Sequence, residues 1–349
     1  MAIDHQMTPA GPAGQVLDPG ATAVAHPNIA LIKYWGKRDE QLMIPYVDSL
    51  SMTLDVFPTT TTVRLSPEAP ADSVTLDGSP AEGEQRRRVV AFLDLVRELA
   101  GRTEPAEVDT RNAVPTGAGL ASSASGFAAL ALAGAAAYGL DLDPTALSRL
   151  ARRGSVSAAR SIFGDFAICH AGRGTSEDAD LDSYAEPVPV PDFDPALVIA
   201  LVDAGPKAVS SRAAMRRTVE TSPLYRSWAT SSAADLTEMR VALRRGDLDA
   251  VGEIAERNAL GMHATMLAAR PAVRYLSPAT VAVLDRVGWL RANGVPAYAT
   301  MDAGPNVKVL CHRTDAARVA EALRDAAPGC SVVTARRGPG ARLRTGAER

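Results

Sequence analysis

A glycine- and serine-rich loop that leads straight into an alanine-rich run is the feature of this sequence that most restricts its fold. Residues 115–126 have the sequence PTGAGLASSASG, and the strongly helical run FAALALAGAAAY follows over residues 127–138. Two glycines let the backbone approach a bulky anion, and the free N–H groups at the start of the following helix attract negative charge. Ser122 and Ser123 add hydroxyls that can donate to phosphate or coordinate Mg²⁺.

The loop fits neither of two common nucleotide-binding patterns. It lacks the Gly-Lys-Ser/Thr that ends a Walker P-loop, and Ser122 stands where a dinucleotide fingerprint has glycine or alanine. The loop therefore indicates phosphate binding of another kind. By itself it leaves open a plain alternative, a tight turn that packs small residues against a helix.

The bulk composition excludes several classes of protein. A length of 349 residues suggests two domains or two fused lobes, and a formal net charge of −3 gives no global basic field for nucleic acid. The three cysteines are far apart and form no C-x-x-C pair, so we expect no disulfide framework or zinc site, which fits a reducing cytoplasm. We find no signal peptide, and no apolar stretch of about 18 residues that would cross a membrane.

Predicted strands and helices alternate along the chain, which indicates an α+β fold. Asp143 followed by Pro144 predicts the start of a helix to about residue 153, and Ser277 followed by Pro278 predicts another that ends at Gly294. Further helices are predicted at residues 89–99 and 314–326. Strands are predicted at residues 51–65, 197–202, 297–301, 307–311 and 331–334.

A cationic motif stands near the N-terminus. Residues 26–38 have the sequence HPNIALIKYWGKR, in which an apolar strand delivers two lysines, an arginine and two aromatic residues around one glycine. Lys33 and Lys37 are suited to clamp an anion that carries several charges. The alternative is a strand whose exposed lysines only solvate a sheet edge.

Three further segments combine hydroxyls, cations and one acid. Residues 151–164, ARRGSVSAARSIFG, include the guanidinium of Arg160, which suits a carboxylate. Residues 207–215, KAVSSRAAM, again place hydroxyls beside cations. In residues 299–306, ATMDAGPN, Asp302 lies at a strand end before a sharp turn, a frequent position for a catalytic group. The plainer alternatives are that Arg160 pairs with a surface acid and that Asp302 caps the turn.

Taken together, these segments resemble those of the mevalonate diphosphate decarboxylases, a family of the GHMP kinase superfamily. Pro-x-Gly-x-Gly-Leu-x-Ser-Ser is the phosphate-loop pattern of the superfamily, and Asn-Ile-Ala-x-x-Lys-Tyr-Trp-Gly-Lys-Arg is typical of the family. The blocks follow the family order from about Thr22 to about Thr334. The resemblance implies a GHMP-kinase-like fold with a ribosomal S5 domain 2-like N-terminal lobe and a ferredoxin-like C-terminal lobe. We expect these lobes at residues 21–203 and 204–335, with a disordered extension at residues 1–20 and a loose tail at residues 336–349.

The resemblance also implies a reaction and a set of site residues. The reaction would be the ATP-dependent decarboxylation of mevalonate 5-diphosphate to isopentenyl diphosphate, with Mg²⁺ as cofactor, in a cytoplasmic homodimer that binds neither nucleic acid nor membrane. Asp302 would take or orient the hydroxyl proton, Arg160 would hold the carboxylate, and Lys33 would lie near both. The residues expected to bind the acid substrate are Tyr34, Lys37, Ser155, Ser157, Ser211 and Met215. Those expected to bind ATP are Pro115, Gly117, Gly119, Leu120, Ser122, Ser123 and Lys207, with Ser123 also a metal ligand. His263 is expected to be a wall residue rather than a base.

The sequence departs from the family pattern at several positions that would adjoin the substrate. Val156 and Asp165 each replace a glycine, Cys169 stands where a tryptophan is usual, and residues 45–48 are PYVD. A β-branched Val156 cannot easily adopt the positive φ that glycine allows, and an ionised Asp165 or Asp48 would repel a diphosphate. These changes leave open a diverged homologue that acts on another β-hydroxy acid, including one without the diphosphate. A kinase that stops after phosphorylation and a non-catalytic ATP-binding module are further alternatives, against which the retained Asp302 and Arg160 argue.

Overall fold

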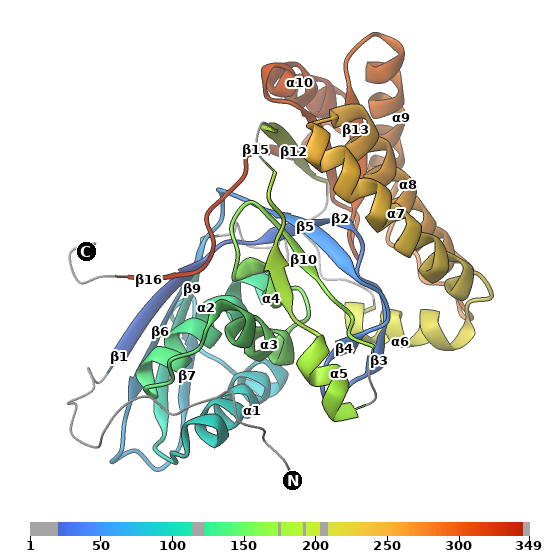
Figure 1. The fold of residues 1–349 in the computed structure, drawn as a ribbon. Helices are drawn as coiled ribbons and strands as arrows, with labels where there is room; N and C mark the ends of the chain where they lie inside the picture. The colour runs from blue at the N-terminus through green and yellow to red at the C-terminus, as the bar shows by residue number, and fades with distance from the viewer. Residues whose placement is uncertain (1–19, 114–121, 174–175, 191–192, 203–208, 345–349) are drawn as a thin grey trace.

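The N-terminal lobe is built on a six-stranded sheet that is covered by helices on one face (Figure 1). The computed structural model describes residues 20–113, 122–173, 176–190, 193–202 and 209–344. The elements of this layer are β1 (Gly20–Ala25), β6 (Thr59–Leu65), β7 (Ser73–Leu76), β8 (Ser79–Pro80), α1 (Gly83–Ala100), β9 (Ala106–Asn112), α2 (Ser122–Ala137), α3 (Pro144–Gly154) and β16 (Arg342–Leu343). The strand order is β16-β1-β6-β9-β7-β8.

The core of this layer lies between the sheet and helices α1 and α2. Val63 on β6 and Val108 on β9 are fully buried and pack against Phe92 of α1 and the alanines of α2. Alanine side chains let α2 lie close against the strands, because they add little bulk between helix and sheet. Thr59 Oγ1 lies 2.7 Å from Ser125 Oγ, which ties the first turn of α2 to β6. The packing therefore fixes where the predicted phosphate-binding helix begins.

A second, four-stranded sheet lies in the middle of the molecule. Its order is β11-β10-β5-β2, and all five residues of both β2 and β5 are buried. These strands pack against the long helices α7 and α8 of the C-terminal half. The elements are β2 (Asn28–Ile32), β5 (Ser49–Thr53), β10 (Phe166–Cys169), β11 (Ala185–Pro187), the hairpin of β3 (Lys37–Asp39) and β4 (Ile44–Pro45), and the short helices α4 (Ala158–Ser161) and α5 (Ser176–Asp182).

The C-terminal lobe has a four-stranded antiparallel sheet between two layers of helices. The elements are β12 (Pro195–Leu201), α6 (Ser211–Thr221), α7 (Tyr225–Arg245), α8 (Leu248–Leu267), α9 (Pro278–Ala292), β13 (Ala297–Met301), β14 (Val307–His312), η1 (Arg313–Asp315), α10 (Ala316–Ala326) and β15 (Ser331–Ala335). The order is β13-β14-β12-β15. Leu197 and Ile199 face the core shared with α7 and α8, whereas Ala196, Val198 and Ala200 face α9 and α10. This alternation follows from the two-residue period of a strand.

The predicted lobe boundary at residue 203 is too late, because β12 precedes it and yet lies inside the C-terminal sheet. β12 pairs with both β14 and β15. The predicted α+β class is confirmed: among the described strand pairs, only β7 and β9 run parallel, so the sheets are not doubly wound. None of the helices in the described ranges combines the length and the apolar character needed to cross a membrane.

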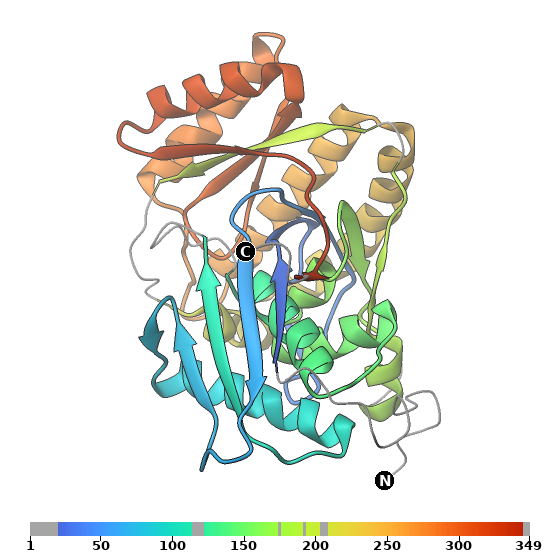
Figure 2. The ribbon, with the colours of Figure 1, turned by 90° about the vertical axis from the view of Figure 1, so that its left-hand side faces the viewer.

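The predicted loose tail is wrong for residues 336–344, which form an ordered strap across the N-terminal lobe. The strap descends from β15 and ends as β16, which pairs with β1 (Figure 2). Gly338 N donates to Thr53 O at 2.8 Å, and Asp165 N donates to Gly338 O at 2.9 Å. A Cβ on Gly338 would lie 2.0 Å from Leu54 O, so only glycine permits this approach. Residues 345–349 lie outside the described residues.

Candidate active site

Asp302 follows strand β13, and its carboxylate lies between two buried lysines. Lys33 Nζ donates to Oδ1 at 2.8 Å, and Lys308 Nζ donates to Oδ2 at 3.0 Å. Lys33 follows β2 in the middle sheet, whereas Lys308 lies on β14 of the C-terminal sheet. Both lysines are almost fully buried, but the Asp302 side chain keeps 37% of its surface exposed. The carboxylate is therefore held from two sides with one edge accessible to a ligand.

Burial and charge oppose each other at Asp302 and at Lys33. Burial favours the neutral form of Asp302, but the ammonium groups of Lys308 and Lys33 more than offset this and hold the pKa of the carboxyl well below its usual range. Burial lowers the pKa of Lys33 to about 8, although the charge of Asp302 favours the ammonium. Asp302 is thus an ionised hydrogen-bond acceptor at neutral pH. The pKa of Lys33, about 8, lies just above neutral pH.

His263 on α8 forms a wall of this cluster. It is 3% exposed, and burial together with the charge of Lys33 lowers its pKa to about 4. Its Nε2 has no hydrogen-bond partner in the described structure. The imidazole is therefore neutral at physiological pH.

Arg160, in the short helix α4, is a buried cation that has no ion pair with any described acid. It is 2% exposed and donates to Ser49 Oγ at 2.6 Å, to Ser51 Oγ at 3.0 Å and to Asn28 Oδ1 at 3.4 Å. Burial lowers its pKa, and Asp302 is close enough to oppose that effect. Burying a charge without a counter-charge costs several kcal/mol. An anion is needed to complete this site, and the planar guanidinium suits a carboxylate.

Three serine hydroxyls connect the start of α2 with the segment that carries Arg160. Ser155 Oγ lies 3.1 Å from Ser157 Oγ and 3.4 Å from Ser123 Oγ. Ser123 is in the first turn of α2, where backbone N–H groups are free to meet an anion. Ser122 begins the same helix. The other predicted ATP-binding residues lie outside the described residues; they are Pro115, Gly117, Gly119, Leu120 and Lys207.

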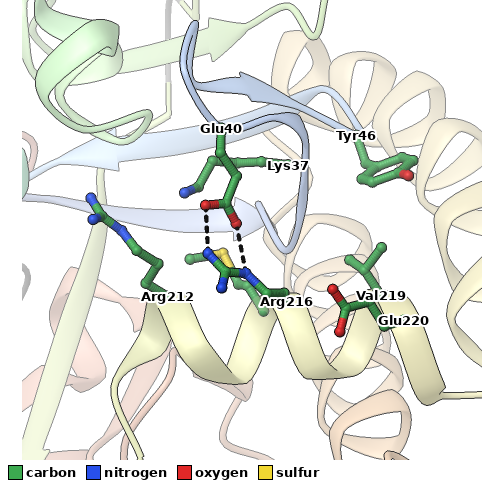
Figure 3. Close-up of a pocket in the computed structure, with 8 residues that line it drawn as sticks. Lys37, Glu40, Tyr46, Arg212, Arg216, Val219 and Glu220 are labelled. Atoms are coloured by element: carbon green, nitrogen blue, oxygen red, sulfur yellow. Dashed lines mark hydrogen bonds and ion pairs between the residues drawn. The ribbon is translucent and has the colours of Figure 1, made fainter.

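A cavity of about 280 Å³ lies between helix α6 and the β3–β4 hairpin (Figure 3). Arg212 and Arg216 project into this region from α6, opposite Lys37 and Glu40 of the hairpin. Arg216 pairs with Glu40 at 2.7 Å, and Arg212 lies 3.6 Å from Glu84 of α1. Lys37 has no ion-pair partner among the described residues, and burial together with the charge of Arg212 lowers its pKa. Lys37 can therefore bind an anion in this cavity directly. Arg212 and Arg216 can bind it if they release their glutamate partners.

The remaining predicted substrate residues border the same region. Met215 lines the cavity, and Ser211 is the first residue of α6, one turn before it. Tyr34 lies in the sequence between Lys33 of the Asp302 cluster and Lys37 of the cavity. Burial raises the pKa of its phenol, so the phenol stays neutral. Tyr34 also packs against the apolar cluster that contains Val156. Lys37 and Met215 thus line the cavity, and the charges of Arg160 and Arg212 both act on Tyr34.

Val156 does not create the predicted backbone conflict. Its φ is not positive, and its side chain is 1% exposed in an apolar cluster with Met43 and Cys169. Asp48 has a structural role, because its Oδ1 accepts a hydrogen bond from Ala171 N at 2.7 Å. Of this group, Tyr46 lines the cavity.

Asp165 lies at the surface and interacts with a cation of the strap. The side chain is 60% exposed, and its Oδ1 lies 3.5 Å from Arg337 Nε on the strap. The φ of Asp165 is 54°, a conformation that favours glycine. The residue therefore occupies a glycine-like backbone position on the surface, beside the strap and away from the cations of the site.

Asp165→Gly and Val156→Gly are expected to differ in stability rather than in specificity. Asp165→Gly relieves a left-handed residue at the cost of an exposed ion pair, which is worth about 0–1 kcal/mol, so its free energy of unfolding should change little. Val156→Gly removes a packed side chain and should lower that free energy by about 2–4 kcal/mol. Neither variant should gain in kcat/KM for a diphosphorylated acid. A large gain in the double variant would show that these positions set the substrate.

Sequence reasoning missed Lys308 and Arg88 as site residues. Arg88 on α1 donates to Gly154 O at 3.0 Å and contributes to the lowered pKa of Lys37. A compositional signal was available for Lys308, since only four of the 37 Lys and Arg residues are lysine, and the three that the structure describes all belong to this region. Lysine can lose its proton in a buried site, whereas arginine keeps its charge. A lysine in an arginine-rich chain is therefore informative.

Two family models together match most of the chain. Residues 25–185 match the diphosphomevalonate decarboxylase-like N-terminal domain, and residues 197–339 match the mevalonate 5-diphosphate decarboxylase C-terminal domain. The phosphomevalonate decarboxylase of Haloferax volcanii is 36% identical over 316 residues, which cover 90% of this chain and 94% of that protein. The diphosphomevalonate decarboxylase of Homo sapiens is 37% identical over 310 residues, covering 82% and 76%.

A solved structure of MDDEF in complex with MVAPP, AMPPCP and magnesium superimposes with a TM-score of 0.88. It is 45% identical and covers 93% of this chain and 98% of that one. This likeness confirms the predicted GHMP-kinase-like fold.

Proposed function

Since the chain belongs to the diphosphomevalonate decarboxylase family, we propose that it converts mevalonate 5-diphosphate and ATP to isopentenyl diphosphate, ADP, phosphate and CO₂. The observation that carries this proposal is the charge arrangement around Asp302. Lys33, Lys308 and Arg160 contribute three buried cations, whereas Asp302 is the one carboxylate that interacts with all of them in the described structure. The cations of the site thus exceed its carboxylates, and the carboxylate of a β-hydroxy acid would balance part of the excess charge.

The proposed chemistry turns a poor leaving group into a good one. Asp302 accepts a hydrogen bond from the tertiary hydroxyl and takes its proton as the oxygen attacks the γ-phosphorus of ATP and ADP leaves. The original C–O bond of the tertiary alcohol then breaks, and the oxygen leaves with the phosphate. The C–C bond to the carboxylate supplies the electron pair of the alkene, and CO₂ departs. Arg160 and Lys33 orient the carboxylate so that this bond is aligned with the leaving phosphate.

The residues at the start of α2 fit a nucleotide and its metal. Ser123 presents a hydroxyl in the first helical turn, and that turn contains no acidic side chain to repel phosphate. Ser123 would hold Mg²⁺ together with the phosphate groups of ATP. When bound, Mg²⁺ neutralises charge on the transferring phosphoryl group.

Ser123→Ala is expected to weaken nucleotide use more than binding of the acid. The hydroxyl lies at the helix end that should face the phosphates, so its loss should raise the KM for ATP·Mg²⁺. Ser66→Ala removes a hydroxyl from another half-buried serine, just beyond the end of β6 that is remote from the first turn of α2, and serves as the control. Steady-state kinetics in each substrate measure both effects. Unchanged ATP affinity and kcat would leave the α2 terminus a structural turn.

The experiment that tests the function measures ADP, phosphate and CO₂ together. We expect equal amounts of all three with mevalonate 5-diphosphate. ADP without CO₂ would indicate a kinase, and the absence of ADP with every acid tested would leave an ATP-binding module. The same assay with mevalonate 5-phosphate addresses the alternative that the Haloferax volcanii relative raises, since it is a phosphomevalonate decarboxylase.

The cavity beside Lys37 supports the diphosphate over the monophosphate. Lys37, Arg212, Arg216 and Arg88 surround this region, and the acids that approach these cations are fewer. A diphosphate brings more negative charge to such a cluster than a monophosphate does. A kcat/KM that is higher for the 5-phosphate would overturn this part of the proposal.

We also propose that the chain acts as a cytoplasmic homodimer, as the family resemblance implies. The thiols of Cys169, Cys311 and Cys330 are free, which suits a reducing compartment. Light scattering on the purified protein measures the assembly, and a monomer at micromolar concentration would contradict the dimer.

A further inference from the structure

Lys308 has a different set of partners from Lys33, although both bind the same carboxylate. Lys308 Nζ donates to Asp302 Oδ2 at 3.0 Å and lies 3.4 Å from Asn306 O, so its own turn and the acid both hold it. Its position on β14, opposite Thr300 of β13, fixes the base of the side chain in the sheet. Lys308 is 3% exposed and belongs to the strand that backs Asp302.

Lys33 retains more capacity to bind a ligand. Its Nζ donates to Asp302 Oδ1 at 2.8 Å, and no other partner of this nitrogen occurs in the described structure. An ammonium has three N–H donors, so Lys33 keeps donors for a further acceptor. Lys33 follows β2 in the other half of the chain, and it binds the carboxylate oxygen that Lys308 does not.

A second buried ammonium is more than Asp302 needs for neutralisation. One lysine would balance its charge, and burial of another cation beside Lys33 and near Arg160 is unfavourable unless it has a use. The charged or titratable groups around Asp302 are Lys33 after β2, Lys308 on β14, Arg160 on α4 and neutral His263 on α8. Lys308 is the one among them that faces Asp302 from its own sheet.

We propose that Lys308 is a positioning residue for decarboxylation, which holds Asp302 through Oδ2 so that Oδ1 and Lys33 are kept in place for the substrate. This proposal rests on the proposed function of the site. Lys308 acts through Asp302 and Lys33 and does not contact the reacting atoms.

The proposal has a consequence for pH dependence. Burial lowers the pKa of Lys33 to about 8, Asp302 opposes this, and the like charge of Lys308 lowers it further. Removing the Lys308 charge therefore raises the pKa of Lys33. If protonated Lys33 is required, activity falls as pH rises through about 8 in the unaltered enzyme. In Lys308→Met this basic limb moves to higher pH, by about one unit or more.

The test compares Lys308→Met, Lys308→Gln and Lys308→Arg with the unaltered enzyme in assays of CO₂ release between pH 6 and 10. We expect Lys308→Met to lose about 10²-fold in kcat, with less change in KM, and to show the shifted basic limb. Lys308→Gln keeps a hydrogen-bond donor without charge and should show the same shift. Lys308→Arg should restore most of kcat and the original limb. Arg313→Met, which removes a cation from an exposed pair with Asp194 just beyond β14, should match the unaltered enzyme.

Binding measurements separate this proposal from the proposed function. Calorimetric titration with mevalonate 5-diphosphate across the same pH range reports the Lys33 titration even without turnover. An unaltered enzyme that binds the acid but releases no CO₂ would contradict the proposed function without deciding the effect of Lys308 on the pKa of Lys33. A basic limb in Lys308→Met and Lys308→Gln that coincides with the original, or an undiminished kcat in either, would overturn the role of Lys308.

Discussion

Asp302→Asn is expected to abolish turnover while ATP binding remains largely intact. The amide has the size of the carboxylate but cannot take the hydroxyl proton, and loss of a proton-handling group costs about 10²–10⁴-fold in rate. The change also leaves Lys33 and Lys308 buried beside each other without their shared counter-charge. We therefore expect a lower melting temperature as well, and a further fall in the pKa of Lys33.

Activity and stability have to be measured together for this variant. Single-turnover release of ADP and CO₂ at a temperature well below the melting point separates the chemical defect from unfolding. Asp194→Asn removes a carboxylate from the exposed pair with Arg313 and is the matched control. A folded Asp302→Asn enzyme with most of the original kcat would remove Asp302 from the mechanism.

The central site residues could be found from the sequence through motifs but not through periodicity. Lys33, Arg160 and Asp302 are separated by more than a hundred residues each, and local patterns carry no information about their contact. The resemblance named all three, and the structure brings Lys33 and Asp302 into direct contact. Lys308 was missed because it interrupts an apolar strand, where a lone charge suggests a solvent-facing position.

Elements with local stop and start signals were predicted well. Asp143 caps α3, with its side chain accepting from Ala146 N at 2.8 Å, and Ser277 forms a capping box with Thr280 at the start of α9. By contrast, the predicted strand at residues 51–65 is two strands, β5 and β6, in different sheets. Thr and Val favour both, and nothing local indicates that the chain changes sheet between them.

The strap shows why composition alone misjudged the C-terminus. Residues 336–341, RRGPGA, look irregular because two glycines and a proline favour neither helix nor strand. In the structure the glycines permit close backbone contact, since a Cβ on Gly340 would lie 2.6 Å from Ile162 O and one on Gly164 would lie 2.8 Å from Gly340 N. Such a requirement arises from the partner segment, so it is visible only in the tertiary structure.

Two fully buried arginines allow a direct comparison between a charge kept for function and a charge kept for structure. Arg160 binds only neutral groups, whereas Arg152 on α3 pairs with Asp180 and donates to Ser183 O at 2.9 Å. Removing one partner of a buried ion pair costs about 3–5 kcal/mol. Removing an unpaired buried charge relieves a desolvation penalty of several kcal/mol, which offsets hydrogen bonds worth about 1 kcal/mol each. The two arginines should therefore respond oppositely to the same substitution.

Arg160→Gln is expected to lower kcat/KM by about 10²–10³-fold, because it removes the charge that is proposed to bind the substrate carboxylate. Thermal stability should not fall. Arg152→Gln should lower the melting temperature but leave kcat per folded molecule near its original value. Mevalonate 5-diphosphate should raise the melting temperature of the unaltered enzyme and of Arg152→Gln, and raise it much less for Arg160→Gln. Thermal melts with and without the acid, together with steady-state kinetics, make the comparison. If Arg160→Gln instead unfolds like Arg152→Gln and binds the acid with full affinity once folded, then Arg160 serves the packing of α4, and the carboxylate must be held elsewhere.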